Sequence, residues 1–199
     1  LNDLGNTTLY DYLNRNRIGS DFGQELIDIY KKVIDILPKF QITAGTSLDY
    51  TVCYPRPVFD KQSMMWDLNY FKYYFLKLVK IPFDEQKLED DFQSFSNFLL
   101  ETDTNYFLYR DFQSRNVMIV DGNPYYIDYQ GGRKGALMYD IASLLYDAKA
   151  DIPQSIRNLL VDYYIEQLSK YIEIDKEKFL KYYNGYVLIR MLQALGAYG

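Results

Sequence analysis

Residues 107–120 of this 199-residue chain read FLYRDFQSRNVMIV, and this stretch decides the fold. Asp111 is followed by four residues and then by Asn116, after which the apolar run 117–120 is typical of a strand. The segment 121–124, DGNP, has the residues of a turn, and a second apolar run at 125–127 ends on Asp128. The pattern predicts a β-hairpin that brings the side chains of Asp111, Asn116 and Asp128 close together.

This spacing suits the transfer of a phosphoryl group, a reaction that depends mainly on positioning and on the neutralisation of charge. Asp111 would accept the proton of the attacking hydroxyl. Asn116 and Asp128 would hold Mg²⁺ on the nucleotide phosphates, and Mg²⁺ needs few protein ligands because it keeps several waters. The alternative is an ordinary hairpin in which Asp and Asn serve only as turn formers.

The motifs resemble those of the aminoglycoside phosphotransferase and choline kinase branch of the kinase-like fold. Within that branch they are most similar to the bacterial amino-sugar kinases of cell-wall recycling, which act on N-acetylmuramate and N-acetylglucosamine. Three segments carry the resemblance: RDFQSRN at 110–116, IDYQGG at 127–132 and YDIASLLYD at 139–147. The likeness covers most of the chain and implies an ATP-dependent kinase that phosphorylates a hydroxyl of a small molecule.

The resemblance also implies roles for the catalytic residues. Asp111 corresponds to the catalytic base, and Asn116 and Asp128 correspond to the ligands of Mg²⁺ and, through it, of ATP. Asp140 corresponds to a buried carboxylate that orients the catalytic loop, although an Asp at the start of a helix can also serve only the helix dipole.

The chain departs from the family at one position of the catalytic loop. The family usually has His before Arg-Asp or Gly-Asp, and this chain has Tyr109 before Arg110 and Asp111. That His is generally a structural hydrogen-bonding residue, so we expect Tyr109 and Arg110 to support the loop and activity to be retained.

Five further side chains are candidates for contact with substrate. Asp67 lies among apolar residues beside Trp66 and could bond a sugar stacked on the indole, but a solvated helix face is the favoured reading. Gln130 and Arg133 flank the glycines of YQGGRKG at 129–135, which could approach a ligand closely or form a flexible solvated loop. Arg115 could contact phosphate or acceptor, or brace the catalytic loop.

Composition excludes several classes of function. The net charge of −5 and the lack of a basic patch argue against a nucleic-acid partner. The absence of His removes every His-based nucleophile, base and zinc site. The single Cys53 precludes an internal disulfide and fits a reducing, cytoplasmic compartment. No apolar run reaches membrane-spanning length, so no membrane partner is expected.

The rest of the chain predicts helices. We expect them near residues 6–15, 21–37, 60–79, 84–99, 137–148 and 153–168, and from 175 onward. Asp21 is expected to cap the second helix and Pro38 to stop it, with 39–59 irregular. The expected fold class is α+β, mostly α: one domain over residues 1–199, the C-terminal lobe of a protein-kinase-like fold with a small catalytic β-hairpin.

The nucleotide-binding part of a kinase-like protein is not recognisable in these residues. The chain starts at Leu1, and it contains neither a glycine-rich nucleotide loop nor a strand lysine for the phosphates. We therefore expect an acceptor-binding lobe, nearly inactive alone, whose partner is its own N-terminal nucleotide-binding lobe. Two alternatives stay open: an aminoglycoside or choline-type kinase, and a non-catalytic pseudokinase. The pseudokinase is disfavoured because Asp111, Asn116 and Asp128 are all present.

Overall fold

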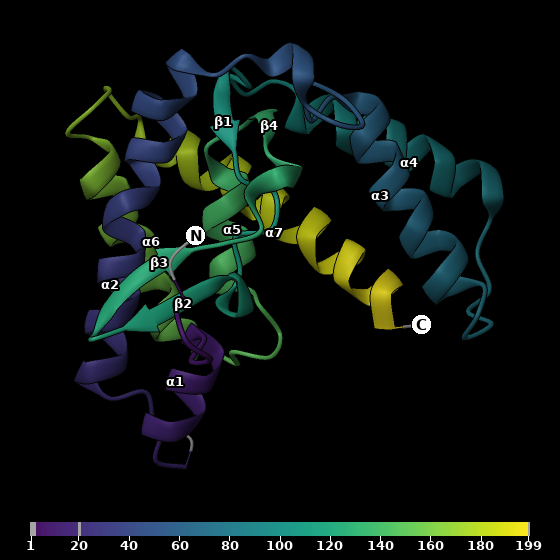
Figure 1. The fold of residues 1–199 in the computed structure, drawn as a ribbon. Coiled ribbons are helices and arrows are strands. Elements are labelled where there is room, and N and C mark those ends of the chain that lie inside the picture. The colour runs from purple at the N-terminus through teal and green to yellow at the C-terminus, as the bar shows by residue number, and fades with distance from the viewer. Residues whose placement is uncertain (1–2, 20, 199) are drawn as a thin grey trace.

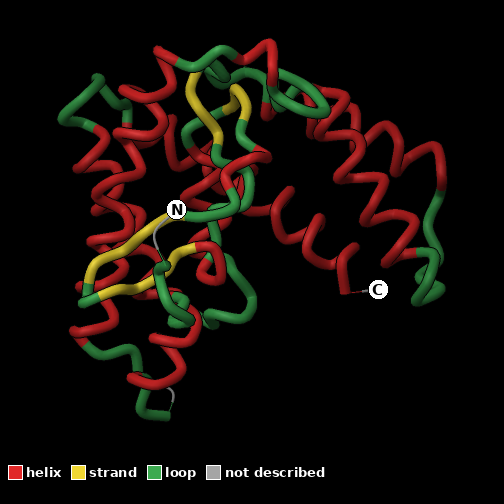
Figure 2. The backbone as a smooth tube through the Cα atoms, in the orientation of Figure 1, coloured by secondary structure: helices red, strands yellow, loops and turns green. Residues whose placement is uncertain are grey.

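The computed structural model describes residues 3–19 and 21–198, which form helices around two small antiparallel sheets (Figures 1 and 2). The helices are α1 (Leu9–Asn16), α2 (Gln24–Pro38), α3 (Lys61–Phe71), α4 (Glu85–Leu99), α5 (Met138–Leu145), α6 (Gln154–Leu168) and α7 (Lys176–Tyr198). The strands are β1 (Tyr106–Leu108), β2 (Val117–Val120), β3 (Asn123–Tyr126) and β4 (Arg133–Gly135). The prediction of a mostly helical α+β fold with a small hairpin is confirmed.

The predicted hairpin forms from β2 and β3, paired from Val117 opposite Tyr126 to Val120 opposite Asn123. Its second strand starts at Asn123, inside the predicted turn 121–124, and ends at Tyr126, one residue before the end of the predicted run 125–127. Asp121 and Gly122 connect the strands and both have positive φ, 50° and 70°, as the tightest hairpin turns require. The outer edge of β2 is also bonded, because the Ile119 N–H donates to the Thr7 carbonyl at 2.8 Å. The second sheet pairs β1 with β4, so it connects the strand before the catalytic loop to the segment after the hairpin.

Two helix pairs flank a central pair. Figure 1 shows α2 and α6 on one side, α3 and α4 on the other, and α5 and α7 between them. Helix α5 is almost completely buried, from Tyr139 to Leu145. The core therefore consists mainly of apolar helix faces, to which Leu108 of β1 and Val117 and Ile119 of β2 are added. None of the described helices is both long and apolar enough to cross a membrane.

The end of the second helix differs from the prediction. Helix α2 begins after Gly23, not at an Asp21 cap, and it does not stop at Pro38. The chain continues as a π-helical turn over Lys39–Ala44, in which the Gly45 N–H donates to the Phe40 carbonyl. This i→i+5 bonding carries the chain past the proline, and it buries Gln41, which donates to the Leu137 carbonyl at 3.1 Å.

The helix predicted for residues 60–79 is also shorter than expected. Asp60 caps α3 by accepting the Ser63 N–H at 3.0 Å, so the predicted start is confirmed. Regular α-helix ends at Phe71, and a π-helical segment, Lys72–Leu76, follows. The predicted helix starts at Asp84 and Asp175 are confirmed, since each of these carboxylates caps the helix that follows it.

Candidate active site

The catalytic loop, residues 109–116, is anchored at its start by a buried carboxylate from α5. Asp140 is fully buried and accepts the backbone N–H groups of Tyr109 at 2.8 Å and Arg110 at 3.1 Å. Burial raises the pKa of Asp140 to about 7, and these two N–H groups act against that rise because they stabilise the charged form. Asp140 therefore holds the backbone of the loop and does more than complement a helix dipole.

Arg110 points into the protein from a left-handed backbone conformation, with φ of 82°. Its guanidinium forms an ion pair with Asp67 at 2.8 Å, donates to the Tyr139 hydroxyl at 2.7 Å and lies 4.7 Å from the centre of the Phe59 ring. A non-glycine residue at positive φ is unfavourable unless its surroundings hold it there. These three contacts provide that hold, directly before Asp111.

The second half of the loop is anchored by Asp147, which follows α5. Its carboxylate accepts the Ser114 backbone N–H at 3.2 Å and also the Ser114 hydroxyl. Asp147 therefore supports the loop and is not an ordinary helix-end charge. The signal that could have found it is the spacing from Asp140, because seven residues are about two turns of the helix predicted near residues 137–148 and would place both carboxylates on one side of it.

Asp111, Asn116 and Asp128 lie together at the open end of the hairpin. The side-chain amide of the buried Asn116 donates to the main-chain carbonyl of Asp111 at 2.9 Å and to the carboxylate oxygen Oδ2 of Asp128 at 3.4 Å. Asp128 has a left-handed backbone, φ 69°, and its second oxygen accepts from Gln130. A Cβ added at Gly131 would lie 3.9 Å from Asp111 Oδ2, so the turn after Asp128 folds back against that carboxylate.

These side chains fit a magnesium ion in type and number. Asp128 offers a carboxylate and Asn116 an amide oxygen, both hard donors of the kind that Mg²⁺ prefers. Among the described residues no group of three or more His, Cys, Asp and Glu side chains could enclose a metal. The fit is therefore to a cation that is bound by few protein ligands and keeps waters and phosphate oxygens as its others.

Tyr109 supports the side of the site that holds Asp128, a candidate metal ligand. Its buried hydroxyl donates to the Ile127 carbonyl at 2.7 Å, directly before Asp128. Burial raises the pKa of Tyr109, so the hydroxyl stays protonated and remains a donor. Tyr109 thus connects the catalytic loop to the end of the hairpin.

The glycine-rich segment 129–135 is not a flexible loop. It forms a short 3₁₀ turn, Tyr129–Gly131, and then β4, which pairs with β1. A Cβ added at Gly132 would lie 2.5 Å from Phe107, and one at Gly135 would lie 2.3 Å from Leu108, so these glycines allow close packing on β1. Arg133 is buried and donates to the Gly131 carbonyl at 3.0 Å, which holds this turn in place.

Two other candidates for substrate contact, Trp66 and Asp67, lie in different environments on α3. The solvated-face interpretation of Asp67 is wrong, because this residue is 8% exposed and paired with Arg110. Trp66 is 47% exposed, and the Arg56 guanidinium lies 5.9 Å from the centre of its ring. Asp67 therefore supports the catalytic loop, and only Trp66 is free to meet a ligand.

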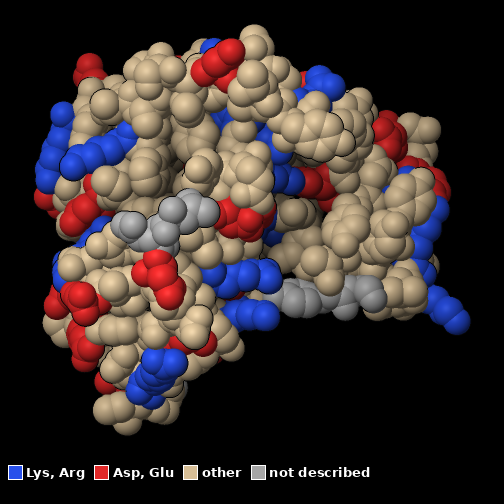
Figure 3. Space-filling model, in the orientation of Figure 1, with Lys and Arg blue, Asp and Glu red and all other residues tan. Residues whose placement is uncertain are grey.

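A cavity of about 360 Å³ opens on Asp111. Its walls come from the catalytic loop, from residues 146–149 and from α7, and the lining residues are Asp111, Gln113, Arg115, Tyr146, Asp147, Ala148, Lys149, Arg190, Gln193, Ala194 and Ala197. Arg115 is exposed here and bonds only the neighbouring Gln113 side chain, at 3.3 Å, among the described residues. Figure 3 shows basic and acidic side chains meeting at the hollowed centre of this face.

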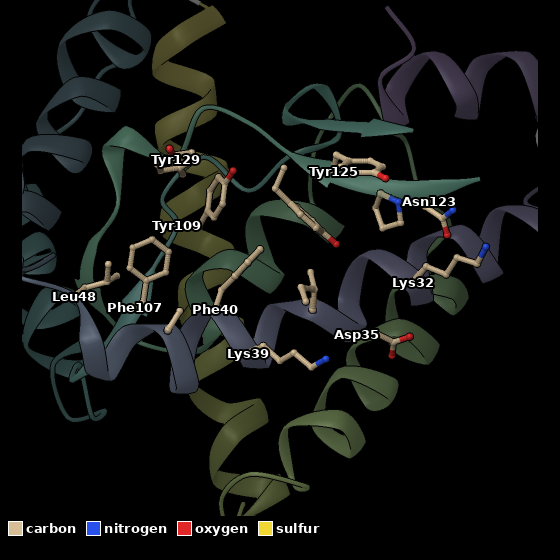
Figure 4. Close-up of a pocket in the computed structure, with 14 residues that line it drawn as sticks. Lys32, Asp35, Lys39, Phe40, Leu48, Phe107, Tyr109, Asn123, Tyr125 and Tyr129 are labelled. Atoms are coloured by element: carbon tan, nitrogen blue, oxygen red, sulfur yellow. The ribbon is translucent and has the colours of Figure 1, made fainter. Parts of the chain in front are cut away.

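Tyr109 lines a larger cavity, of about 720 Å³ (Figure 4). It is bounded by α2, the π-helical turn and the hairpin, and aromatic side chains dominate its lining: Phe40, Phe107, Tyr109, Tyr125, Tyr126 and Tyr129. Asp111, Asn116 and Asp128 are not among its lining residues. The larger cavity therefore contains none of the three candidate catalytic residues, while the smaller one contains Asp111.

Comparison with known proteins gives two similar curated relatives, and no family model matches the chain. It is 26% identical over 153 residues to the N-acetylmuramate/N-acetylglucosamine kinase of Neisseria meningitidis serogroup B, covering 74% of this chain and 42% of that protein. The chain is also 26% identical over 183 residues to the Pseudomonas putida protein of the same name, covering 89% of this chain and 49% of that protein. The chain thus spans less than half the length of these relatives.

Solved structures with the same fold include two small-molecule kinases. Choline kinase from Cryptosporidium parvum superposes with a TM-score of 0.57 at 13% identity, covering 85% of this chain and 58% of that one. ADP-bound aminoglycoside phosphotransferase APH(2'')-Ib superposes with a TM-score of 0.55 at 16% identity, covering 94% of this chain and 70% of that one. The resemblance drawn from the motifs is therefore confirmed: the chain has the kinase-like fold of choline kinase and aminoglycoside phosphotransferase, and its sequence is similar to that of N-acetylmuramate/N-acetylglucosamine kinases.

Proposed function

We propose that this chain is the catalytic, acceptor-binding part of an ATP-dependent small-molecule phosphotransferase. The observation that carries the proposal is the Asn116 amide, which donates to the main-chain carbonyl of Asp111, the residue whose side chain would be the base, and to the Asp128 carboxylate. It supports a site in which a proton acceptor lies beside a pair of magnesium ligands. Phosphoryl transfer needs these two elements, held at fixed separation, more than it needs covalent chemistry from the protein.

Each residue has a defined part in the proposed reaction. The acceptor hydroxyl oxygen forms a bond to the γ-phosphorus while the bond to the β–γ bridging oxygen breaks, and ADP leaves. Asp111 accepts the hydroxyl proton. Asn116 and Asp128 would hold Mg²⁺, which would neutralise charge on the phosphates. Asp140 and Asp147 keep the loop between these groups in one conformation by bonding its backbone at both ends.

The acceptor we propose is a neutral or acidic amino sugar, such as N-acetylglucosamine or N-acetylmuramate. The names of the two curated relatives support this choice. The cavity beside Asp111 supports it as well, because Arg115, Lys149 and Arg190 line it. Three cations would repel a polycationic aminoglycoside or the quaternary ammonium group of choline, so these two acceptor classes rank lower. Bacterial cell-wall recycling in the cytoplasm is the setting that this acceptor suggests.

We also propose that the nucleotide-binding lobe lies outside these 199 residues. The chain spans only 42% and 49% of the curated relatives, and a nucleotide-covering loop and phosphate lysine are not recognisable in it. Without such a lobe ATP would not be held in line with the acceptor. Residues 1–199 alone should therefore transfer phosphate very slowly.

A coupled ADP-release assay on the full-length protein tests the function. The acceptors are N-acetylmuramate, N-acetylglucosamine, kanamycin and choline, each with MgATP and with EDTA in place of Mg²⁺. Magnesium-dependent turnover with the amino sugars supports the proposal. Turnover with kanamycin or choline but with neither amino sugar would reverse the ranking, and no turnover with any acceptor would favour a non-catalytic binding module.

A further inference from the structure

The cavity that opens on Asp111 has a charge opposite to that of the chain. The chain carries −5 overall, but this cavity is lined by Arg115, Lys149 and Arg190 against Asp111 and Asp147. Asp147 is already engaged, since its carboxylate accepts the backbone N–H groups of Ser114 and Lys149. In the described part of the chain none of the three cations forms an ion pair with a carboxylate. The positive charge is therefore available to a ligand.

Arg190 is the most firmly positioned of these cations. It projects from α7, its guanidinium lies 5.5 Å from the centre of the Tyr139 ring, and it bonds the Gln193 side chain. The Tyr139 hydroxyl accepts from Arg110 at 2.7 Å and from Arg190 at 3.4 Å, so one phenol connects Arg190 to the catalytic loop. Arg190 Nε is buried without a protein partner. A guanidinium held in this way is preorganised for a planar anion.

The position of the cavity indicates which substrate would supply that anion. Its lining includes Asp111 but neither Asn116 nor Asp128, the proposed magnesium ligands. A group bound in it therefore lies on the acceptor side of the catalytic base and not on the phosphate side. A cavity of about 360 Å³ is also of the size that binds small molecules.

We propose that Arg190, assisted by Lys149, binds a carboxylate of the acceptor and sets a preference for acidic over neutral amino sugars. The inference rests on the proposed function, because it assumes that an amino sugar binds beside Asp111. N-acetylmuramate carries such a carboxylate on its lactyl group, and N-acetylglucosamine has none. The structure thus assigns a specificity role to a residue more than seventy positions away from the catalytic motif.

The test compares N-acetylmuramate with its methyl ester, two acceptors that differ in the charge of one group. In the full-length protein Arg190→Gln should lower kcat/KM for the acid about 10- to 100-fold, the loss expected for a charge-assisted hydrogen bond. The same substitution should change kcat/KM for the ester less than threefold, and Arg190→Lys should recover part of the loss. Lys181→Gln, which removes a cation from the same helix outside the cavity, is the matched control and should leave both acceptors unaffected.

Two kinetic outcomes would overturn the inference. An equal loss with the acid and the ester would show that Arg190 only supports the fold through Tyr139. A raised KM for ATP with an unchanged preference between acid and ester would show that it serves the nucleotide phosphates.

Binding separates this inference from the proposed function. If wild type transfers phosphate to no amino sugar, calorimetry without nucleotide still compares the acid with the ester. If the wild type binds the acid more tightly than the ester, and if Arg190→Gln abolishes this difference, the anion site would be supported although the kinase proposal had failed. Equal binding of the two would overturn the anion site whatever the enzyme's activity.

Discussion

The two cavities beside the catalytic loop differ in size and in chemistry. The larger, about 720 Å³, is lined mainly by aromatic and aliphatic side chains and lacks all three catalytic candidates. The smaller, about 360 Å³, is lined by charged and polar side chains together with three alanines, and it opens on Asp111. Tyr109 lines the larger cavity, and Asp111 lines the smaller one. Volume is therefore a poor guide to the chemical site here, and the position of titratable groups is a better one.

The largest expected effect concerns Asp111, the proposed base in the smaller cavity. Asp111→Asn keeps the shape of the side chain and removes its ability to accept a proton. Turnover in the full-length protein should fall by about 10²- to 10⁴-fold at saturating Mg²⁺. Steady-state kinetics measure this, and an unchanged melting temperature would show that the fold is intact. Full activity of the variant would show that Asp111 is not the base.

Asp128→Asn tests the metal side of the same site. The substitution removes one negative charge that would face Mg²⁺, so the Mg²⁺ concentration needed for half-maximal rate should rise by about 10- to 100-fold. A magnesium titration at fixed ATP measures it. The matched variant is Asp121→Asn, at the exposed tip of the hairpin, which should leave the titration unchanged. Equal magnesium curves for wild type and Asp128→Asn would contradict the assignment.

Asp140 should make stability depend on pH, because burial raises its folded-state pKa to about 7 from an ordinary value of 3.8. Between these values the folded state holds a proton that the unfolded state has released. The contribution of this group is therefore fully present below about pH 4 and is lost as the pH rises through about 7. Asp140→Asn cannot titrate, so the stability of wild type relative to the variant should fall between pH 4 and 7. Urea unfolding at several pH values would show this, and a constant difference would contradict it.

The smallest effect is expected in the larger cavity. Leu48 lies on its rim with 45% of its surface exposed, so Leu48→Ser should change the free energy of unfolding by no more than about 0.5 kcal/mol. Its kcat/KM for N-acetylmuramate and for the methyl ester should equal those of wild type. A changed preference between the two acceptors would show that the larger cavity, and not the charged one, selects the acceptor.

Much of the fold was readable from local pattern, and the errors have local causes. Helix starts at Asp84 and Asp175 were predictable because a capping side chain acts within three residues. The stop at Pro38 was not correct, because π-helical bonding continues the helix past it. The sequence left two interpretations of the glycines at 132 and 135, a close approach to a ligand or a flexible solvated loop. The structure shows a third reason for them, close packing on β1, which sequence spacing does not reveal.

The sequence by itself determined the hairpin and the convergence of Asp111, Asn116 and Asp128, because two-residue turns and strand register act over a few residues. Only the tertiary structure decided what surrounds that site. Asp67 on α3 forms an ion pair with Arg110, and Arg110 donates to the Tyr139 hydroxyl. Arg190 on α7 donates to the same hydroxyl. Contacts between helices far apart in the chain depend on tertiary packing. The residues that make them follow no regular separation along the sequence, so a single sequence does not reveal them. The overall charge is −5, yet packing gathers three cations, Arg115, Lys149 and Arg190, in the cavity beside Asp111.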